Sequence, residues 1–193
     1  AIEEWVGMIY SSALSAVVSA LAAECIDSTA KQAWQKLYQA GEARPAGPAI
    51  SAEDRMTADC WVFARLHHGL KPRHWHALVA KYSTHKGRKV EAIGKLCPVV
   101  ATPAPALFLH KAITAWAIPP LKGVEGKRST RDLIVLPREF YDMNTWQTDG
   151  RPEQTRRRWR LGIHKVLEEM VCEALVEAEK ILEAEGVLVE RAA

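Results

Sequence analysis

The chain has 193 residues, of which 48% are hydrophobic, so it can bury a core in one globular domain, or in one domain with an appended helix. Its formal net charge of +3 is too small to indicate a partner, and the distribution of charge along the chain is more informative. The four cysteines stand too far apart for a CxxC zinc or redox motif, which this spacing excludes. Each cysteine has apolar neighbours, so we expect buried free thiols in a reducing compartment, the cytoplasm.

The N-terminal stretch from Trp5 to Ala23 contains no charged residue and is long enough to cross a membrane. Four serines and a glycine dilute its apolarity, and Glu3 and Glu4 precede it where a signal peptide would carry positive charge. We therefore expect no membrane span. The pattern instead predicts a packed helix with a face of small residues, which are Ala13, Ala16, Ala20 and Ala23.

Residues 24–50 complete this N-terminal part. Asp27 or Ser28 would cap a second helix, which ends at Gly41. Its apolar positions are Ala33, Trp34, Leu37 and Tyr38. Residues 1–44 thus predict a helical pair, and the proline- and glycine-rich stretch 42–50, EARPAGPAI, predicts a linker to the next segment.

Residues 51–118 predict a core of short helices. Ser51 and Asp54 resemble a capping box, and Gly69 ends the helix that they begin. Pro72 begins a second helix, because proline is tolerated in the first turn. A break at Ser83, Thr84 and Gly87 precedes a third helix, and Thr102 with Pro103 would cap and begin a fourth. The apolar positions expected to be buried are, helix by helix, Met56, Cys60, Trp61, Phe63 and Ala64; Trp75, Leu78, Val79 and Tyr82; Val90, Ala92, Ile93 and Leu96; and Leu107, Phe108, Ile113 and Trp116.

This core is also the most basic part of the chain. Between Ser51 and Val90, eight Lys and Arg residues stand against three Asp and Glu residues, a net charge of +5, and five of the seven histidines lie there as well. A basic face beside a turn between helices attracts nucleic-acid phosphates by releasing counterions. The alternative is a solvated surface without a ligand.

After Ile118 the helical periodicity stops at Pro119 and Pro120. Between residues 119 and 160, ten basic residues oppose six acidic ones, so the stretch has a net charge of +4. Leu133–Leu136 could form one short strand. Phe140, Tyr141 and Trp146 could stack on bases or anchor residues 119–151 to the core, and the absence of a repeated platform favours anchoring. We expect an irregular basic arm over residues 119–151.

A long C-terminal helix is predicted over residues 152–186, beginning at Pro152 and ending at Gly186. Its apolar stripe consists of Trp159, Ile163, Val166, Met170, Ala174, Ala178 and Ile181. Arg156, Arg157 and Arg158 oppose the helix dipole at its start, and seven glutamates do so in its later turns. The arginines are therefore predicted to bind an anion, with Trp159 as their buried anchor. The alternative is that pairs with neighbouring helices offset the unfavourable charges.

The sequence gives little support to catalysis. His74 and His76 form an HxH pair, but residues two apart on a helix point about 200° apart and cannot share one metal ion. Asp132, Glu139 and Asp142 could form a carboxylate cluster of a metal-dependent nuclease, although acids in a polar loop are more often solvated. No HExxH, P-loop, GxSxG or Cys-His pairing is present. We expect a non-enzymatic protein without metal or cofactor.

The stretch LKPRHWHALVAKYSTHKGRKVEAIGKL, followed by a capped helix ending in AITAW, resembles the helix-turn-helix region of phage late-gene antitermination regulators of the Q type. The same layout occurs in sigma-factor region 4. The resemblance covers about a quarter of the chain and implies a role linked to transcription. In this layout the recognition helix is PAPALFLHKAITAW, and here it offers only His110 and Lys111 to base edges, fewer polar groups than such helices usually carry.

Together these observations predict an all-α, multi-helix single domain with a helix-turn-helix-like basic centre, an irregular basic arm and a long C-terminal helix. The expected function is that of a DNA-binding regulator of transcription, antiterminator-like, with duplex DNA and RNA polymerase as partners. The alternative is a phage or bacterial module that docks on a host protein without binding nucleic acid. The residues predicted to contact nucleic acid are Arg65, Lys71, Arg73, Lys81, Lys86, Arg88, Lys89, His110, Lys111, Arg156, Arg157 and Arg158.

Overall fold

The computed structural model describes residues 10–22, 52–120, 134–147 and 149–188. Within these ranges the chain is all helical and forms one compact domain, which confirms the predicted fold class. The elements are α2 (Ala13–Ala22), α4 (Ala52–Gly69), α5 (Pro72–Tyr82), α6 (Lys86–Leu96), α7 (Ala106–Ala117), the 3-10 helices η1 (Arg138–Tyr141) and η2 (Met143–Thr145), and α8 (Glu153–Ala184). The predicted helix over residues 27–41 and the linker 42–50 lie outside the described residues.

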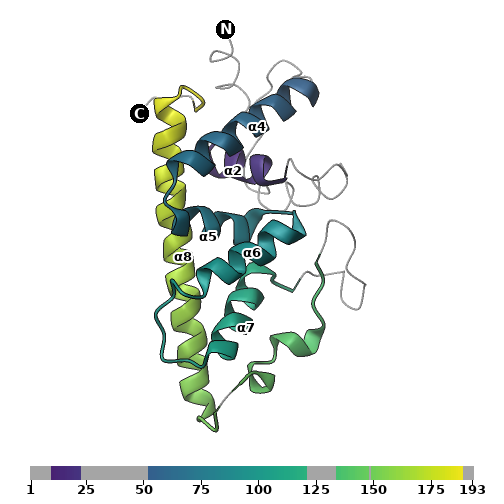
Figure 1. The fold of residues 1–193 in the computed structure, drawn as a ribbon, viewed down its shortest axis with the longest axis vertical. Coiled ribbons are helices and arrows are strands. Elements are labelled where there is room, and N and C mark those ends of the chain that lie inside the picture. Colours follow the sequence, from purple (N-terminus) through teal and green to yellow (C-terminus); the bar gives the residue numbers. More distant parts are fainter. Residues whose placement is uncertain (1–9, 23–51, 121–133, 148, 189–193) are drawn as a thin grey trace.

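Helix α8 forms one edge of the molecule, and the other described helices lie to one side of it (Figure 1). Its 32 residues give a length of about 48 Å. Helices α2, α4, α5 and α7 all contact α8. Gly186 follows the helix with a φ of +70°, a conformation that suits glycine and ends the helix where the sequence predicts. The buried residues of α8 form one stripe along the helix, spaced mostly three or four apart: Ile163, Leu167, Met170, Val171, Ala174, Ala178 and Leu182.

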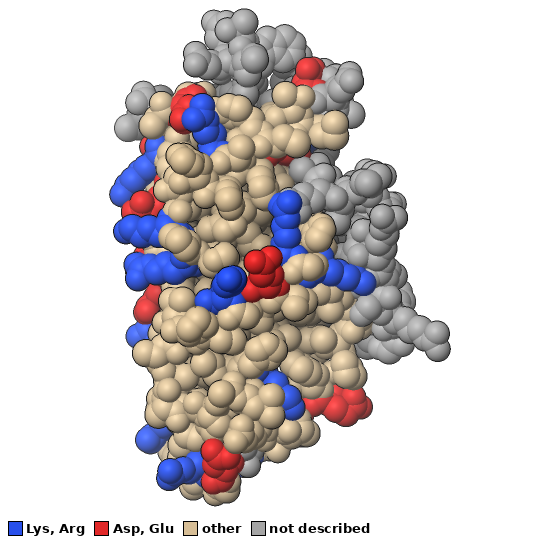
Figure 2. Space-filling model, in the orientation of Figure 1, with Lys and Arg blue, Asp and Glu red and all other residues tan. Residues whose placement is uncertain are grey.

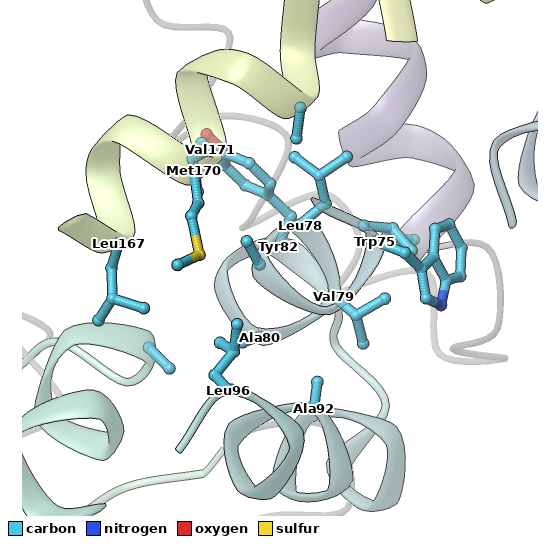
Figure 3. Close-up of a cluster of buried hydrophobic side chains, with 14 of the residues drawn as sticks. Trp75, Leu78, Val79, Ala80, Tyr82, Ala92, Leu96, Leu167, Met170 and Val171 are labelled. Carbon is cyan, nitrogen blue, oxygen red and sulfur yellow. The ribbon is translucent and has the colours of Figure 1, made fainter. Parts of the chain in front are cut away.

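Helix α5 is the centre of the core, because it packs against α2, α6, α7 and α8. Its four predicted apolar positions, Trp75, Leu78, Val79 and Tyr82, are all buried. Figure 3 shows α5 between α8 on one side and Ala92 and Leu96 of α6 on the other, with Trp75 pointing away from both. The Trp75 ring packs edge-on against Phe63 and His67 of α4. Ala77 and Ala80 are fully buried, and their small side chains allow the neighbouring helices to approach α5 closely.

Helix α2 is buried over almost its whole surface, with nine of its ten residues inaccessible. The described part of the predicted first helix is therefore a packed core helix, as expected. Ser12 and Ser15 cap its start reciprocally, since each backbone N–H donates to the other side chain, at 3.1 and 3.2 Å. Tyr10 links this segment to α4 by donating a 2.7 Å hydrogen bond to the buried Asp59. Among the described residues, no helix is long and apolar enough to cross a membrane.

The predicted buried face of α4 is only partly correct, because Trp61 and Phe63 are half-buried and pack against the core whereas the other three predicted positions are exposed. Met56 is 56% exposed, and Cys60 and Ala64 are also exposed. The buried stripe is instead Ala58, Val62 and Leu66, which repeat every four residues and face α2 and α8. Several apolar stripes were possible on this helix, and the position of its neighbours selected one of them.

Helices α6 and α7 also differ from the prediction in detail. Val90 is 59% exposed on α6, although Ala92, Ile93 and Leu96 are buried as expected, and Gly87 lies inside the helix. Helix α7 begins at Ala106, after Pro105, and not at Pro103 as the sequence predicts. Thr102 does not cap the helix, because its hydroxyl accepts the N–H of Ala104 in the preceding turn. Leu107, predicted to be buried, is exposed on the first turn of α7.

The described thiols are free, as predicted, but the expectation that they are buried is wrong. Cys60 and Cys172 are exposed and Cys97 is half-buried, and all three are free. Cys97 donates to the carbonyl of Ile93 at 3.4 Å, and burial raises the pKa of its thiol. Cys25 lies outside the described residues.

The described part of the arm contains no strand, and Ile134–Leu136 follow an irregular path instead of the predicted one. Its aromatic residues anchor it to the core, as expected. Trp146 is buried, donates through Nε1 to the carbonyl of Phe140 at 2.8 Å and packs edge-on against Phe108. Tyr141 donates to the carbonyl of Ile118 at 2.7 Å, which ties η1 to the end of α7.

Candidate nucleic-acid interface

Helices α5 and α6 are joined by a turn of three residues, Ser83 to His85. The N–H of Ser83 still bonds to the carbonyl of Val79 at 3.0 Å, and the N–H of His85 donates to Oγ of Ser83 at 3.1 Å. His85 then caps α6, because its Nδ1 accepts the N–H of Arg88 at 3.2 Å. Helices α5 and α6 pack against each other through this short, capped turn and form one unit, the α5–α6 unit.

Lys89 lies inside this unit and does not reach the surface. The residue is 4% exposed, and its ammonium donates to the carbonyls of Lys81 at 3.1 Å and Ser83 at 3.3 Å. Loss of water around the ammonium lowers the pKa of Lys89 to about 7. The sequence-based assignment of Lys89 to phosphate binding is therefore wrong, because the side chain closes the end of α5 instead.

The exposed face of α6 carries two glycines, the basic Arg88 and Lys95, the apolar Val90 and one acidic residue, Glu91; the glycines are Gly87 and Gly94. Lys86 is half-buried at the N-terminus of this helix. The guanidinium of Arg88 lies 4.9 Å from the centre of the Phe63 ring, which directs it toward α4. Figure 2 shows basic side chains on both sides of acidic atoms over the region of α6. Lys95 and the exposed Val90 were not among the predicted site residues. Their positions could have been found by projecting 86–96 onto a helix with Ala92, Ile93 and Leu96 inside.

Helix α7 does not present a comparable face. It packs against α5, α6, α8 and η1, and Phe108, Ala112, Ile113 and Trp116 are buried. His110 is exposed and Lys111 is half-buried, so few polar groups are available on this helix. The helix of the α5–α6 unit with the broader exposed face is α6, whereas residues 103–116, where the sequence predicts the recognition helix, are largely buried.

Three other predicted contacts pair with glutamates of α8 or with Glu185, the residue that follows it. Arg73 lies 3.0 Å from Glu173, and Arg65 lies 3.5 Å from Glu185. Lys81 forms an ion pair with Glu168. Lys71 is exposed at the position before α5. Exposed pairs contribute about 1 kcal/mol or less, so Arg65 and Arg73 could exchange their partners for phosphates.

Lys81 is held more firmly than the two arginines. Its side chain is 20% exposed, and Glu168 also accepts the indole N–H of Trp116 at 2.8 Å. Partial loss of water raises the pKa of Glu168, but the hydrogen bonds from Lys81 and Trp116 outweigh it and lower that pKa. Lys81 therefore belongs to a contact between α5, α7 and α8 and is a poor phosphate ligand.

Arg156, Arg157 and Arg158 lie in the first turns of α8, beside the arm and α7 and away from the α5–α6 turn (Figure 1). Arg157 pairs with Glu153 of the same helix at 2.6 Å, and Arg158 is exposed. Arg156 is half-buried, and among the described residues its Nε has no hydrogen-bond partner. Trp159 is half-buried and packs edge-on against Phe108 at 5.5 Å, so it contacts the core but is not a fully buried anchor.

The histidines and carboxylates considered for metal binding are dispersed. His74 is buried with Nε2 3.0 Å from Glu173, whereas His76 is half-buried elsewhere on α5, and burial together with Lys95 lowers the pKa of His76. Asp142 is exposed and caps η2 by accepting from Asn144. Asp132 lies outside the described residues, and within them no three potential metal ligands lie together.

Comparisons of the chain with models of protein families, with characterised proteins and with solved structures give no match.

Proposed function

We propose that this chain is a non-enzymatic DNA-binding regulator of transcription in which α5 and α6 form the helix-turn-helix unit. The observation that carries the proposal is the three-residue turn, capped by Ser83 and His85, which holds α6 with one face in the core and the other in solvent. A helix presented in this way can enter the major groove, which is wide enough for one α-helix.

The exposed face of α6 suits contact with DNA. Gly87 and Gly94 have no bulky side chains, so the backbone could approach the duplex closely. Arg88 and Lys95 supply positive charge, and Val90 could contact a thymine methyl group. The helix N-terminus, with Lys86 beside it, would favour a phosphate.

The residues outside α6 have a supporting role in this proposal. Lys71 and Arg73 precede or begin α5, where the first helix of such a unit crosses the DNA backbone. Arg156 and Arg158 could bind a more distant phosphate or an acidic surface of RNA polymerase. Antitermination of the phage type, in the cytoplasm and with RNA polymerase as a partner, is the specific role that we propose.

One observation favours the alternative of a module that docks on a host protein. Arg65, Arg73, Lys81 and Arg157, four of the predicted phosphate contacts, already pair with glutamates in the structure. In that case the basic residues stabilise the fold and the chain needs no nucleic acid.

The test is a titration of the purified chain against a labelled DNA duplex at low and at moderate salt, followed by fluorescence anisotropy. The affinity should fall with salt with a slope of about −0.9 for each neutralised phosphate. Replacing Lys86 and Lys95 together with alanine should weaken binding and make the slope shallower. No binding at low salt would overturn the proposal.

A matched control removes the same charge elsewhere. Arg138 on η1 and Lys180 on α8 are both exposed, so the double variant R138A/K180A has the same net charge as K86A/K95A. The control should keep most of the affinity. Equal losses in the two variants would show a diffuse electrostatic attraction and not a contact through α6. Binding to RNA polymerase in the absence of DNA affinity would support the docking alternative.

A further inference from the structure

The outer face of α8 is a second surface that the proposed DNA contact does not use. At 100° per residue, the eight residues Arg158, Leu161, Lys165, Glu169, Cys172, Val176, Glu179 and Glu183 fall within an arc of about 80°, opposite the buried stripe. All eight are exposed, and two are large apolar residues, Leu161 at 69% and Val176 at 51%. Figure 1 shows this side of α8 turned away from the other described helices.

Charge is divided along this face. Its first half carries Arg158 and Lys165, and its second half carries Glu179 and Glu183, with Glu169 between them. This order of charges does not stabilise an isolated helix, because basic residues near its N-terminus and acidic residues near its C-terminus both oppose the helix dipole. Two copies of the helix placed antiparallel would match each basic half with an acidic half.

We propose that a second copy of this chain docks antiparallel on the outer face of α8, forming a symmetric dimer. A two-fold axis between residues 168 and 169 sets Arg158 opposite Glu179 of the second copy and Leu161 opposite Val176. Because the pairing is isologous, each of these contacts occurs twice. The face extends from Arg158 to Glu183, about 38 Å at 1.5 Å per residue, so the interface would follow most of the helix.

The carboxylates nearest the axis do not prevent this arrangement. Glu168 turns toward the body of the protein and interacts with Lys81 and Trp116. Glu169 lies 3.8 Å from Lys165 of its own helix, which offsets its charge. The apolar contact is small, so the dimer should be weak and should depend on concentration and on salt.

The test is a charge exchange, measured by analytical ultracentrifugation of the full chain at low and at high salt. Wild type should dimerise at low salt, and high salt should weaken the dimer. Arg158→Glu alone and Glu179→Arg alone should each weaken it about tenfold, because each places two like-charged pairs in the interface. The double variant R158E/E179R should recover the wild-type dimer, since the exchanged charges again face each other.

Matched controls separate this effect from a general change in charge. K95E and E91R make the same reversals on α6, off the proposed interface, and should leave the dimer unchanged. Circular dichroism establishes that each variant keeps its helix content. A monomer at all concentrations at low salt would overturn the proposal, as would a double variant that remains as weak as the singles.

Cross-linking provides a readout on a chain without charge changes. In the proposed register the two Cys172 residues lie on one face, offset by about 10 Å along the helix axis. A bis-maleimide with a spacer of that length should cross-link two wild-type chains. The Cys172→Ser variant, which keeps the exposed Cys60, should lose that product. Cross-linking that persists in the serine variant would count against the α8 interface.

Discussion

The ammonium of Lys89 donates to the carbonyl of Lys81, eight residues earlier, at 3.1 Å, and so joins the start of α6 to the end of α5. A second hydrogen bond reaches the carbonyl of Ser83 at 3.3 Å. These are carbonyls that the end of a helix leaves without an intrahelical partner. A lysine in the most basic stretch of the chain thus fixes the turn of the proposed helix-turn-helix unit.

The burial of Lys89 should make the stability of the protein depend on pH. Its pKa is lowered to about 7 in the folded chain, compared with about 10.4 when unfolded, so the unfolded state binds more protons between these values. Stability should therefore rise as the pH increases from about 7 toward 10, by about 1.4 kcal/mol per pH unit at most. Chemical denaturation across this range measures the effect.

Lys89→Met serves as the comparison for this prediction, because it removes the titrating group and keeps most of the apolar stem. The rise in stability between pH 7 and 10 should be smaller in the variant by the contribution of Lys89. Identical pH profiles in the two proteins would show that Lys89 is charged throughout the range.

Tyr10→Phe should destabilise the protein through the buried Asp59. Tyr10 donates a 2.7 Å hydrogen bond to Asp59, which is fully buried, and burial followed by the charge of Asp59 raises the pKa of the phenol. Hydrogen bonds to charged groups contribute about 1.5–3 kcal/mol. Urea denaturation should show a loss of this size.

Tyr141→Phe is the matched control, because its hydroxyl donates at the same 2.7 Å distance but to a neutral carbonyl, that of Ile118. We expect a smaller loss, about 0.5–1.5 kcal/mol. Equal losses in the two variants would mean that the charge of Asp59 adds nothing to the bond with Tyr10.

Glu168 should contribute stability that disappears in acid. Partial loss of water raises the pKa of Glu168, but the hydrogen bonds from Lys81 and Trp116 outweigh this and hold its folded pKa below the ordinary value of 4.5. A depressed carboxyl pKa gives stability that is present above the unfolded pKa and is lost as the pH falls through the folded pKa. The difference between wild type and Glu168→Gln should shrink below about pH 4.5. Thermal unfolding at several pH values measures it, and a constant difference would contradict the assignment.

Gly94→Ala should stabilise α6 by about 0.5–1 kcal/mol, because glycine is a poor helix former. A Cβ added at this position meets no atom within 4 Å, so no steric penalty offsets the gain. The melting temperature should rise.

Gly94→Glu should instead reduce DNA affinity if α6 lies in the groove, since it adds a bulky negative charge to that face. Unchanged affinity in the glutamate variant would move the DNA contact away from α6.

The sequence alone determined where the clearest helices begin and end. Pro72 at the start of α5 and Gly186, with its positive φ, after α8 act through their own backbone conformation, so their effect is local. Gly69 ends α4 as predicted. The strong apolar periodicity of α5 also identified its buried residues, because that helix is surrounded by neighbours and has one dominant apolar face.

Only the tertiary structure decided what the charged and exposed residues do. Arg73 donates a hydrogen bond to Glu173, which lies one hundred positions later in the chain. Lys89 is buried, whereas its neighbour Val90 is exposed to solvent. A local pattern cannot assign such roles, because the free energy of a charged group depends on the water it loses and the partners it gains. Those partners come from distant parts of the chain, and only the packing of α4 and α5 against α2 and α8, with α6 packed on α5, brings them together.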